Sequence, residues 1–332
     1  MATPADGHKG YFQIGKAATW GTPATITNKW DFLDESIELD VDTIEDDALW
    51  GNVDARAAYQ GSRFVKGSIS FKVTFEGVME LLRGVLGTYP APTTVETGVR
   101  DHLIKSGADT LPFYTGQIVK GNVPAGKCWS IDTFKMVSLS LEGSNQTGMA
   151  GVVKATLGII GRDLDTNATP TAIGSFPSLF PVKFDQQITT DDGTADATAD
   201  VAVRSWKLDI DQPHTDRERI YGALLISEPM RKGRPSYTWS MTQEFQTRTQ
   251  LAALQAGTSG SPRFVYQHPT TIGVSSKREF ELRMNEAKLI STSVPTPGPG
   301  SLIATSVWKA FYDATDTAAL VARFRNTEVA LP

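Results

Sequence analysis

The feature that most constrains this chain is a strand-and-helix pattern that occurs twice. The first copy runs from Lys66-Gly67 to Gly87-Thr88, and the second runs from Lys232-Gly233 to Gly257-Thr258. In each copy apolar and polar residues alternate, as in a half-buried strand, and a short helical pattern follows. We expect each helix to end at its glycine, Gly87 or Gly257, because glycine adopts a positive φ at little cost.

Further landmarks recur in the same order. The matched pairs are LDVD at 39–42 with LDID at 208–211, Trp50-Gly51 with Tyr221-Gly222, and the segment from Gly151 to Asp163 with the segment from Gly300 to Asp313. Together they indicate an internal duplication with a period of roughly 150 to 170 residues, far longer than a solenoid repeat. Each copy is therefore predicted to be a domain, which agrees with a length of 332 residues.

These landmarks divide the chain into four predicted parts. They are an extended N-terminal arm at 1–30 with little core of its own, a first domain at 31–163, a linker at 164–180 and a second domain at 181–332. The domains are rich in Val, Thr, Ile and Ser strand patterns with one short helix each, which indicates a mainly β fold. In the second helix we expect Leu251 and Leu254 to face the interior.

Residues 31–47 are strongly acidic. The segment contains Asp31, Asp34, Glu35, Glu38, Asp40, Asp42, Glu45, Asp46 and Asp47, and no basic residue. Ile37, Leu39 and Val41 alternate with carboxylates, so we expect a strand with an apolar face inside and an acidic face outside. That acidic face is either an ordinary solvated surface or one that lies opposite something that must not bind to it.

Two long polar connections follow the matched strands. The first spans 44–64 and includes Trp50 and Tyr59, and the second spans 211–231. Loops of this length are unusual in a compact domain unless they are functional or are ordered by a partner. The exposed aromatic residues favour a partner.

The composition excludes several classes of protein. A formal charge of −5 and a pI near 5.5 argue against a protein whose function is to bind nucleic acid tightly, because phosphate neutralisation requires an excess of Lys and Arg. Cys128 is the only cysteine, so no disulfide forms within the chain, and its apolar surroundings predict a buried thiol. The N-terminal residues do not resemble a secretory signal, and no apolar run is long enough to span a bilayer.

No catalytic, cofactor-binding or metal-binding site is predicted. The sequence has no Gly-x-Ser-x-Gly nucleophile elbow, phosphate-binding loop or dinucleotide fingerprint. The histidines, His8, His102, His214 and His268, lie far apart and lack metal-ligand spacing. We therefore expect a structural protein that assembles into a larger complex, not an enzyme.

The chain resembles the tail tube proteins of long, non-contractile-tailed bacteriophages. The similarity lies in IGKAATWGTPAT at 14–25, the LDVD strand, the long connection, KGSISFKVTFEGVMELLRGVLGT at 66–88, and the closing segments that contain VKATLGIIG and IATSVWKAFYD. It covers nearly the whole chain.

The resemblance implies a fold and an assembly. The expected fold is mainly β, with two tandem duplicated β-sandwich domains, each with a short flanking helix and a long hairpin loop that reaches the next ring. Rings of six tube domains would stack into the tail tube that conducts DNA, so a chain with two such domains would need three copies per ring. The implied partners are further copies, the tape measure protein, the tail terminator and distal tail proteins, and DNA that passes without specific binding. No cofactor or membrane is implied, and the location would be the virion tail, assembled in the host bacterial cytoplasm.

The resemblance also assigns roles to individual residues. The candidate lumen lining is Glu38, Asp40 and Asp42. The candidate contacts between rings are Asp46, Asp47, Trp50, Arg56, Tyr59, Arg217, Arg219 and Tyr221. Like charges facing the duplex would limit drag, since every facing Lys or Arg would add affinity for DNA.

Other interpretations remain open from the sequence. The chain could be another tail component of the same fold, such as a tube terminator or distal ring, or part of a tail-like bacteriocin or gene-transfer particle. From a different class, a tandem carbohydrate-binding β-sandwich could use Trp50, Trp206, Trp239 and Trp308 as sugar platforms, although Trp239 lies on the inward face of its strand. An unrecognised hydrolase has no motif in its favour.

Overall fold

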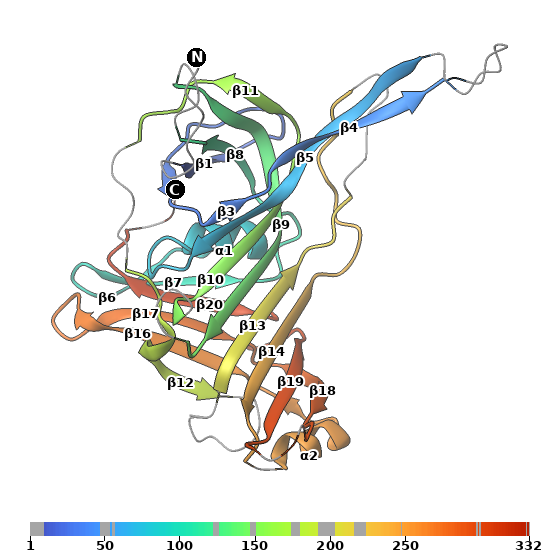
Figure 1. Ribbon diagram of the computed structural model, residues 1–332. Helices are drawn as coiled ribbons and strands as arrows, with labels where there is room; N and C mark the ends of the chain where they lie inside the picture. The colour runs from blue at the N-terminus through green and yellow to red at the C-terminus, as the bar shows by residue number, and fades with distance from the viewer. Residues whose placement is uncertain are drawn as a thin grey trace.

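The computed structural model describes residues 10–46, 54, 57–121, 126–146, 151–173, 180–191, 203–215, 224–246, 248–296, 298, 300–329 and 331. Their fold is mainly β, with two antiparallel sheets and two short α-helices (Figure 1). The larger sheet has 14 strands and the smaller has six.

The larger sheet draws on both halves of the sequence. Its strands are β1 (Tyr11–Ala17), β2 (Asn28–Trp30), β3 (Asp34–Glu35), β4 (Glu38–Glu45), β5 (Ala58–Lys72), β8 (Phe113–Val119), β9 (Cys128–Ser144), β10 (Lys154–Gly161), β11 (Leu164–Ala168), β13 (Val203–Asp211), β14 (Ser236–Glu244), β15 (Ser259–Gly260), β18 (Ala287–Ser293) and β19 (Ile303–Ala310). The main path runs β15-β18-β19-β14-β13-β9-β10-β5-β3, and β4 pairs with β5 along the same edge as β3. The halves meet where β9 pairs with β13.

The smaller sheet also joins the two halves. It contains β6 (Thr93–Glu96), β7 (Val99–Lys105), β12 (Gln187–Asp191), β16 (Arg263–Thr271), β17 (Lys277–Arg283) and β20 (Val321–Asn326). The order is β12-β16-β17-β20-β7-β6, so the C-terminal strand β20 pairs with β7 of the first half. Both sheets therefore continue from one half of the chain into the other, where the sequence suggested two separate sandwiches.

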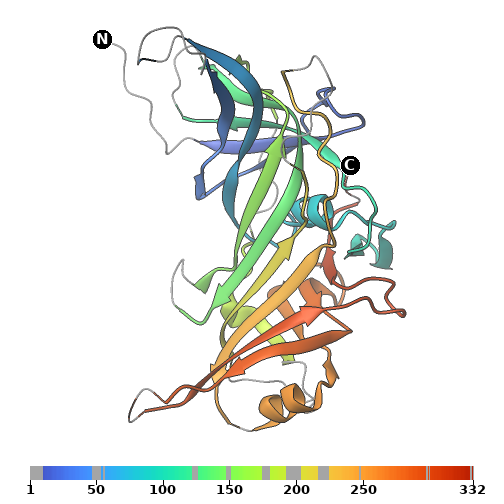
Figure 2. The ribbon, with the colours of Figure 1, turned by 90° about the vertical axis from the view of Figure 1, so that its right-hand side faces the viewer.

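One face of the larger sheet packs against the smaller sheet and forms the core (Figure 2). Strands β13 and β14 alternate strictly, so Trp206 and Trp239 point inward. Both indoles contact Phe264 of β16, with ring centroids 5.4 and 4.6 Å apart. Burial of large aromatic side chains such as these contributes strongly to the stability of a sandwich.

The two helices have the predicted ends but different environments. Helix α1 (Met79–Leu86) ends at Gly87 with φ +87°, and α2 (Thr249–Ala256) ends at Gly257 with φ +62°. All of α1 except Arg83 is buried, whereas Gln250 is the only buried residue of α2. The prediction of an inward side chain is wrong for Leu251, which is 42% exposed, whereas Leu254 does pack, partly buried, against the core.

The N-terminal segment contributes more to the core than its composition indicated. Strand β1 pairs with β8 over seven residues, and its Phe12 and Ile14 are fully buried. Part of the predicted linker is also structured, since β11 pairs with β9.

The acidic segment and the first long connection form a projecting ribbon instead of a core strand and a loop. Strands β4 and β5 pair from Glu38↔Lys66 to Glu45↔Ala58 and extend beyond the body of the molecule (Figure 1). Ile37 is buried, but Val41 is 37% and Ile44 is 56% exposed. The expected apolar inner face therefore holds at Ile37 and at Leu39, which packs partly buried against the core, and ends at Val41, where the ribbon leaves the body.

The LDVD and LDID motifs do not occupy equivalent places. Leu39 pairs with Val65, just before Lys66-Gly67, whereas Leu208 pairs with Trp239, well after Lys232-Gly233. The two motifs therefore pair with different parts of the strands that follow the matched Lys-Gly pairs.

Candidate assembly surfaces

The face of the larger sheet that turns away from the core is lined by hydroxyl groups. Because each strand alternates, the residues between the buried ones share this face, which we call the open face. Its serines and threonines include Ser68, Ser70, Ser138, Ser140, Thr156, Ser205, Ser236, Thr238, Ser240, Thr242 and Thr305. They lie on strands of both halves. The alternation that produces this surface is visible in the sequence, although its extent across both halves is not.

Two lysines on the open face, Lys66 and Lys207, have carboxylate partners. Lys66 Nζ lies 2.7 Å from Asp40 and 3.7 Å from Glu38, and the hydrogen bond to Asp40 raises the pKa of the Lys66 ammonium. Lys207 lies 2.8 Å from Asp209 on the same strand. Pairing of this kind lowers the net field of the surface, so the face is polar without a strong single sign.

The three predicted lumen residues do not form one uniform carboxylate row. Glu38 and Asp40 both contact Lys66, which sequence reasoning missed because Lys66 is distant in the chain. The Asp42 carboxylate accepts a hydrogen bond from the hydroxyl of Ser62 at 2.6 Å. The acidic character of the segment is therefore partly neutralised by its partner strand.

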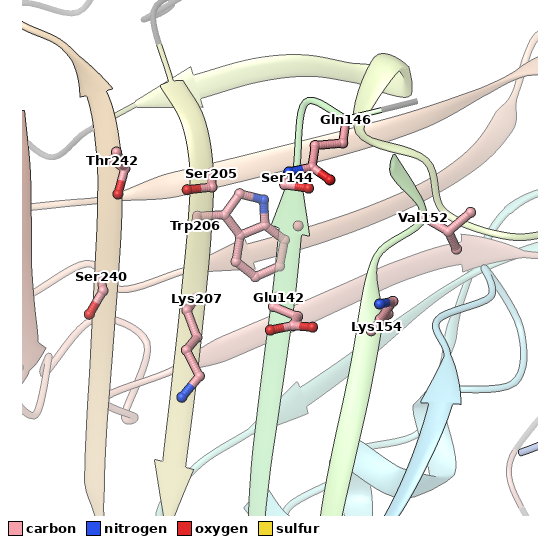
Figure 3. A pocket seen from close by; sticks show the side chains of 11 residues that line it. Glu142, Ser144, Gln146, Val152, Lys154, Ser205, Trp206, Lys207, Ser240 and Thr242 are labelled. Atoms are coloured by element: carbon pink, nitrogen blue, oxygen red, sulfur yellow. The ribbon is translucent and has the colours of Figure 1, made fainter. Parts of the chain in front are cut away.

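A shallow depression of about 300 Å³ marks the place where the halves join (Figure 3). Polar side chains surround it, among them Glu142, Lys154 and Lys207. Trp206 forms its floor beside Gly143, where an added Cβ would lie 2.8 Å from the indole nitrogen. The lining offers no buried polar group that converges on a bound ligand.

The β4–β5 ribbon carries exposed apolar residues. Ile44 and Tyr59 face each other across the ribbon and are 56% and 58% exposed. Asp46 follows β4, and its N–H donates to the carbonyl of Ala57 at 2.9 Å. Of the predicted inter-ring contacts, Asp46 and Tyr59 therefore lie on this ribbon, while Asp47, Trp50 and Arg56 lie outside the described residues.

The second long connection packs onto the first half. The N–H of Arg63 donates to the carbonyl of Leu224 at 3.0 Å, and Lys135 Nζ contacts Glu228 at 2.7 Å and the carbonyl of Pro229 at 2.8 Å. Lys135 is almost fully buried, so these two oxygens are its essential partners. Arg217, Arg219 and Tyr221 lie outside the described residues.

Buried charged groups elsewhere are partnered within the fold. The Glu80 carboxylate accepts a hydrogen bond from Tyr114 at 2.8 Å and contacts Arg83 at 3.4 Å, and burial raises its pKa. Glu76 pairs with Arg278, and burial likewise raises the pKa of that carboxyl. Each group bridges core elements and does not open into a cavity.

His102 joins the C-terminal segment to β7. Its Nε2 donates to the carbonyl of Glu328 at 3.2 Å, so Nδ1 accepts from the Tyr89 hydroxyl at 2.8 Å. Burial lowers the pKa of this imidazole. Among the described residues no group of His, Cys, Asp and Glu is arranged to hold a metal ion.

The tryptophans considered as sugar platforms are buried wherever the structure describes them. Trp206, Trp239 and Trp308 are at most 2% exposed, and Trp50 lies outside the described residues. Cys128 is buried, as expected. None of the described helices has both the length and the apolar character needed to cross a bilayer.

These surfaces suit assembly, and the comparison with protein families agrees. The family model described as phage tail tube protein matches residues 7–310. No curated protein matched the chain. The chain therefore belongs to the phage tail tube protein family, whose members are structural, non-enzymatic parts of the virion tail and polymerise with copies of themselves.

Proposed function

We propose that three copies of this chain close into a pseudo-hexameric ring and that the rings stack into the tube that conducts DNA from capsid to host. The observation that carries the proposal is a repeated strand order. The first half contributes β3-β5-β10-β9 and the second contributes β13-β14-β19-β18 to one continuous sheet. In each half the first two strands form a hairpin, the helix follows the second strand, and the closing hairpin returns beside it.

This repeated order supports a duplication in which each half is one tube domain. The first would comprise residues 31–163 and the second residues 181–332, with 164–180 between them. The edge pairing of β9 with β13 inside the chain then represents the contact that also joins neighbouring chains. Unpaired sheet edges favour such additions, and a heterologous contact that closes gives a ring.

We propose that the open face lines the lumen. Uncharged hydroxyl groups cover much of this face, and the pairing of Lys66 and Lys207 with carboxylates lowers their affinity for a moving duplex, since each unpaired Lys or Arg adds salt-dependent affinity. Glu38, Asp40 and Asp42 lie along β4 at one edge of the sheet and would contribute carboxylates to that lining. The β4–β5 ribbon, with Asp46 and Tyr59, would reach the next ring.

Geometry gives the size of such a ring. Eight strands per chain form the main path from β3 to β18. Three chains supply about 24 strands, which at about 4.8 Å spacing and about 40° tilt enclose a barrel about 50 Å across. Six chains per ring would double that diameter.

Negative-stain electron microscopy and mass measurement of the purified chain test the function. We expect tubes or rings with an axial hole, a six-fold outline and a mass of three chains per ring. Six chains per ring would overturn the stoichiometry alone. Single rings that never stack would indicate a terminator or distal ring. A chain that stays monomeric at all concentrations and does not join purified tails would overturn the proposal.

The remaining partners follow from that function. We propose that the tube encloses the tape measure protein during assembly and ends at the terminator and distal tail proteins. These contacts would use the two ends of a stacked tube, where the ribbon or its receiving surface stays uncovered. Assembly would take place in the host bacterial cytoplasm.

A further inference from the structure

A segment that follows β20 lies across the first half of the chain. Its described residues are 327–329 and 331, which we call the C-terminal segment. Side chains of the first half contact its backbone, and we call them the clasp: Tyr89, Arg100 and His102. The segment is therefore bound by groups that lie at least 226 residues away in the sequence.

Two members of the clasp keep their charge state near neutral pH. Arg100 Nη1 donates to the carbonyl of Val329 at 3.2 Å, and the N–H of Leu331 donates to the Tyr89 hydroxyl at 3.3 Å. Guanidinium groups stay charged in proteins, and burial raises the pKa of Tyr89 above its usual value of 10.0. Tyr89 and Leu331 also pack, partly buried, against the core, so the segment covers apolar surface.

His102 is the member of the clasp that can change charge near neutral pH. Its side chain is fully buried, and both ring nitrogens are used. Nε2 donates to the carbonyl of Glu328 at 3.2 Å, and Nδ1 accepts from the Tyr89 hydroxyl at 2.8 Å. This arrangement suits the neutral imidazole, because a proton on Nδ1 would point at the Tyr89 oxygen and the hydroxyl hydrogen would lose its acceptor.

The charged groups around the ring do not offset a second proton on it. Those that face His102 or its partner Tyr89 are Glu80 and Arg83 of α1, Arg100 and Asp101 of β7, and Glu328 of the segment. Glu80 and Asp101 already have basic partners, which are Arg83 at 3.4 Å and Arg325 at 2.8 Å. Glu328 contacts the ring through its backbone carbonyl. The two nearby guanidinium groups repel an imidazolium.

The direction of the pH dependence follows from the burial of the ring. Burial lowers the pKa of His102, and Arg100 acts in the same direction, while contacts with Glu328, Asn326 and Asp101 oppose the shift without reversing it. A released imidazole would regain its ordinary pKa of 6.5. Binding of the segment is therefore strongest above pH 6.5 and weakens as the pH falls from 6.5 through the lower pKa of the bound state.

We propose that protonation of His102 releases the C-terminal segment, so that the clasp holds it near neutral pH and lets it go in acid. The step transfers one proton from water to Nδ1 and breaks no covalent bond. The inference concerns the single chain, so it stands or falls independently of the proposed ring.

Release would affect the place where the two halves meet. The segment continues from β20, which pairs with β17 of the second half and with β7 of the first. Asn326, the last residue of β20, donates from Nδ2 to the carbonyl of Phe75 at 3.1 Å and accepts from the N–H of Glu328 at 3.0 Å. Loss of the segment would uncover Tyr89 beside α1 and loosen this end of β20.

A spin label on the segment tests the clasp. Val329→Cys attaches it at a side chain that is 65% exposed, and the native Cys128 is buried. The label should be immobile at about pH 8 and mobile at about pH 5, with a midpoint below the ordinary histidine value of 6.5. The same label at Thr305→Cys, an exposed position of β19, should keep one mobility throughout, because it reports only general unfolding.

Two substitutions in the clasp show whether His102 carries the response. His102→Gln keeps a donor for the carbonyl of Glu328 but cannot take up a proton, so the label should stay immobile. Tyr89→Phe removes the hydroxyl that stabilises the neutral ring, so the midpoint should rise by about half to one pH unit. His214→Gln is the matched control and should leave the response unchanged, since burial also lowers the pKa of His214 but its ring contacts the carbonyl of Gln212.

The outcomes separate the clasp from a purely structural contact. A label at Val329→Cys whose mobility does not change with pH would overturn the proposal. A response that persists in His102→Gln, or that the label at Thr305→Cys shares, would overturn it as well. If His102→Gln frees the segment at every pH, the Tyr89→Phe midpoint decides: a rise supports the clasp, and an unchanged midpoint overturns it.

Discussion

Gly143 occupies the point where the two halves of the larger sheet meet. An added Cβ there would lie 2.8 and 2.9 Å from two atoms of the Trp206 indole, and Trp206 packs on Phe264 and Tyr266. The Trp206 nitrogen donates to the Tyr266 hydroxyl. A glycine at this position therefore allows the aromatic core to pack directly against the backbone where the two halves join.

We predict that Gly143→Val lowers the free energy of unfolding by about 1–3 kcal/mol, because the core must shift to make room. Urea unfolding followed by tryptophan fluorescence measures the change. Gly300→Val is the matched control, since a Cβ added at Gly300 would have no atom within 4 Å and the φ of this residue is not positive. Equal stability of the two variants would contradict the prediction.

Glu80 makes stability depend on pH in an unusual direction. Burial raises the pKa of its carboxyl above the ordinary value of 4.5, so the folded chain holds this proton to a higher pH than the unfolded chain does. The contribution of Glu80 to stability is therefore present at low pH and declines as the pH rises through the folded pKa.

We predict that Glu80→Gln removes this decline. The variant should gain stability relative to the original chain as the pH rises from 4.5 toward 7. Urea unfolding at a series of pH values gives the slope. The same exchange at exposed Glu142 controls for loss of one carboxylate, and an identical slope for Glu80→Gln and the original chain would disprove the assignment.

At the scale of elements, the matched segments of the two halves have acquired different surroundings. Helix α1 is enclosed, while α2 lies at an end of the molecule with one buried residue. The first long connection is a free ribbon, while the described part of the second is fixed to the first half through Lys135 and Arg63. Segments with similar sequence patterns therefore make different contacts in the two halves.

For the ribbon, we predict that Ile44→Ser with Tyr59→Ser reduces stacking of rings but changes the stability of the single chain by less than about 0.5 kcal/mol. Both side chains are more than half exposed, so little area is lost within the chain. Sedimentation and electron microscopy measure tube length, and thermal unfolding measures stability. Ile188→Ser, at a 52% exposed isoleucine of the smaller sheet, should leave tubes unchanged. Full-length tubes from the ribbon variant would rule out this contact.

At the scale of the whole molecule, one sheet presents a continuous polar face while the smaller sheet closes the other side. Curvature of that sheet into a ring would give the open face to the lumen and the smaller sheet to the exterior. The two faces should therefore differ in accessibility once tubes form.

We predict that Ser140→Cys on the open face reacts with a small maleimide in tubes but is protected from a maleimide attached to a large polymer. The single chain should react with both reagents. Thr93→Cys on β6 is the control and should react with both reagents in both states. Equal protection of the two positions in tubes, or reaction of Ser140→Cys with the polymer, would show that the open face does not line the lumen.

Much of the fold could be predicted from local periodicity in the sequence. Alternation placed Trp239 in the core and produced the hydroxyl rows, and the glycines marked both helix ends, because these features depend on backbone geometry within a few residues. The order of matched segments also anticipated the repeated strand order. The family was recognisable from these patterns and from the long connections.

The amino-acid sequence alone thus determined the mainly β character, the two short helices with their glycine ends, the buried Cys128 and the family. Only the tertiary structure decided that the halves share both sheets, that Lys66 neutralises Glu38 and Asp40, that β4 leaves the body, and that Leu251 lies at the surface. Alternation states which residues share a face, but it does not state whether another layer covers that face. The layer that buries a sheet face, the register between strands and the partners of charged side chains all involve segments far apart in the sequence. They are therefore fixed only when the chain has folded.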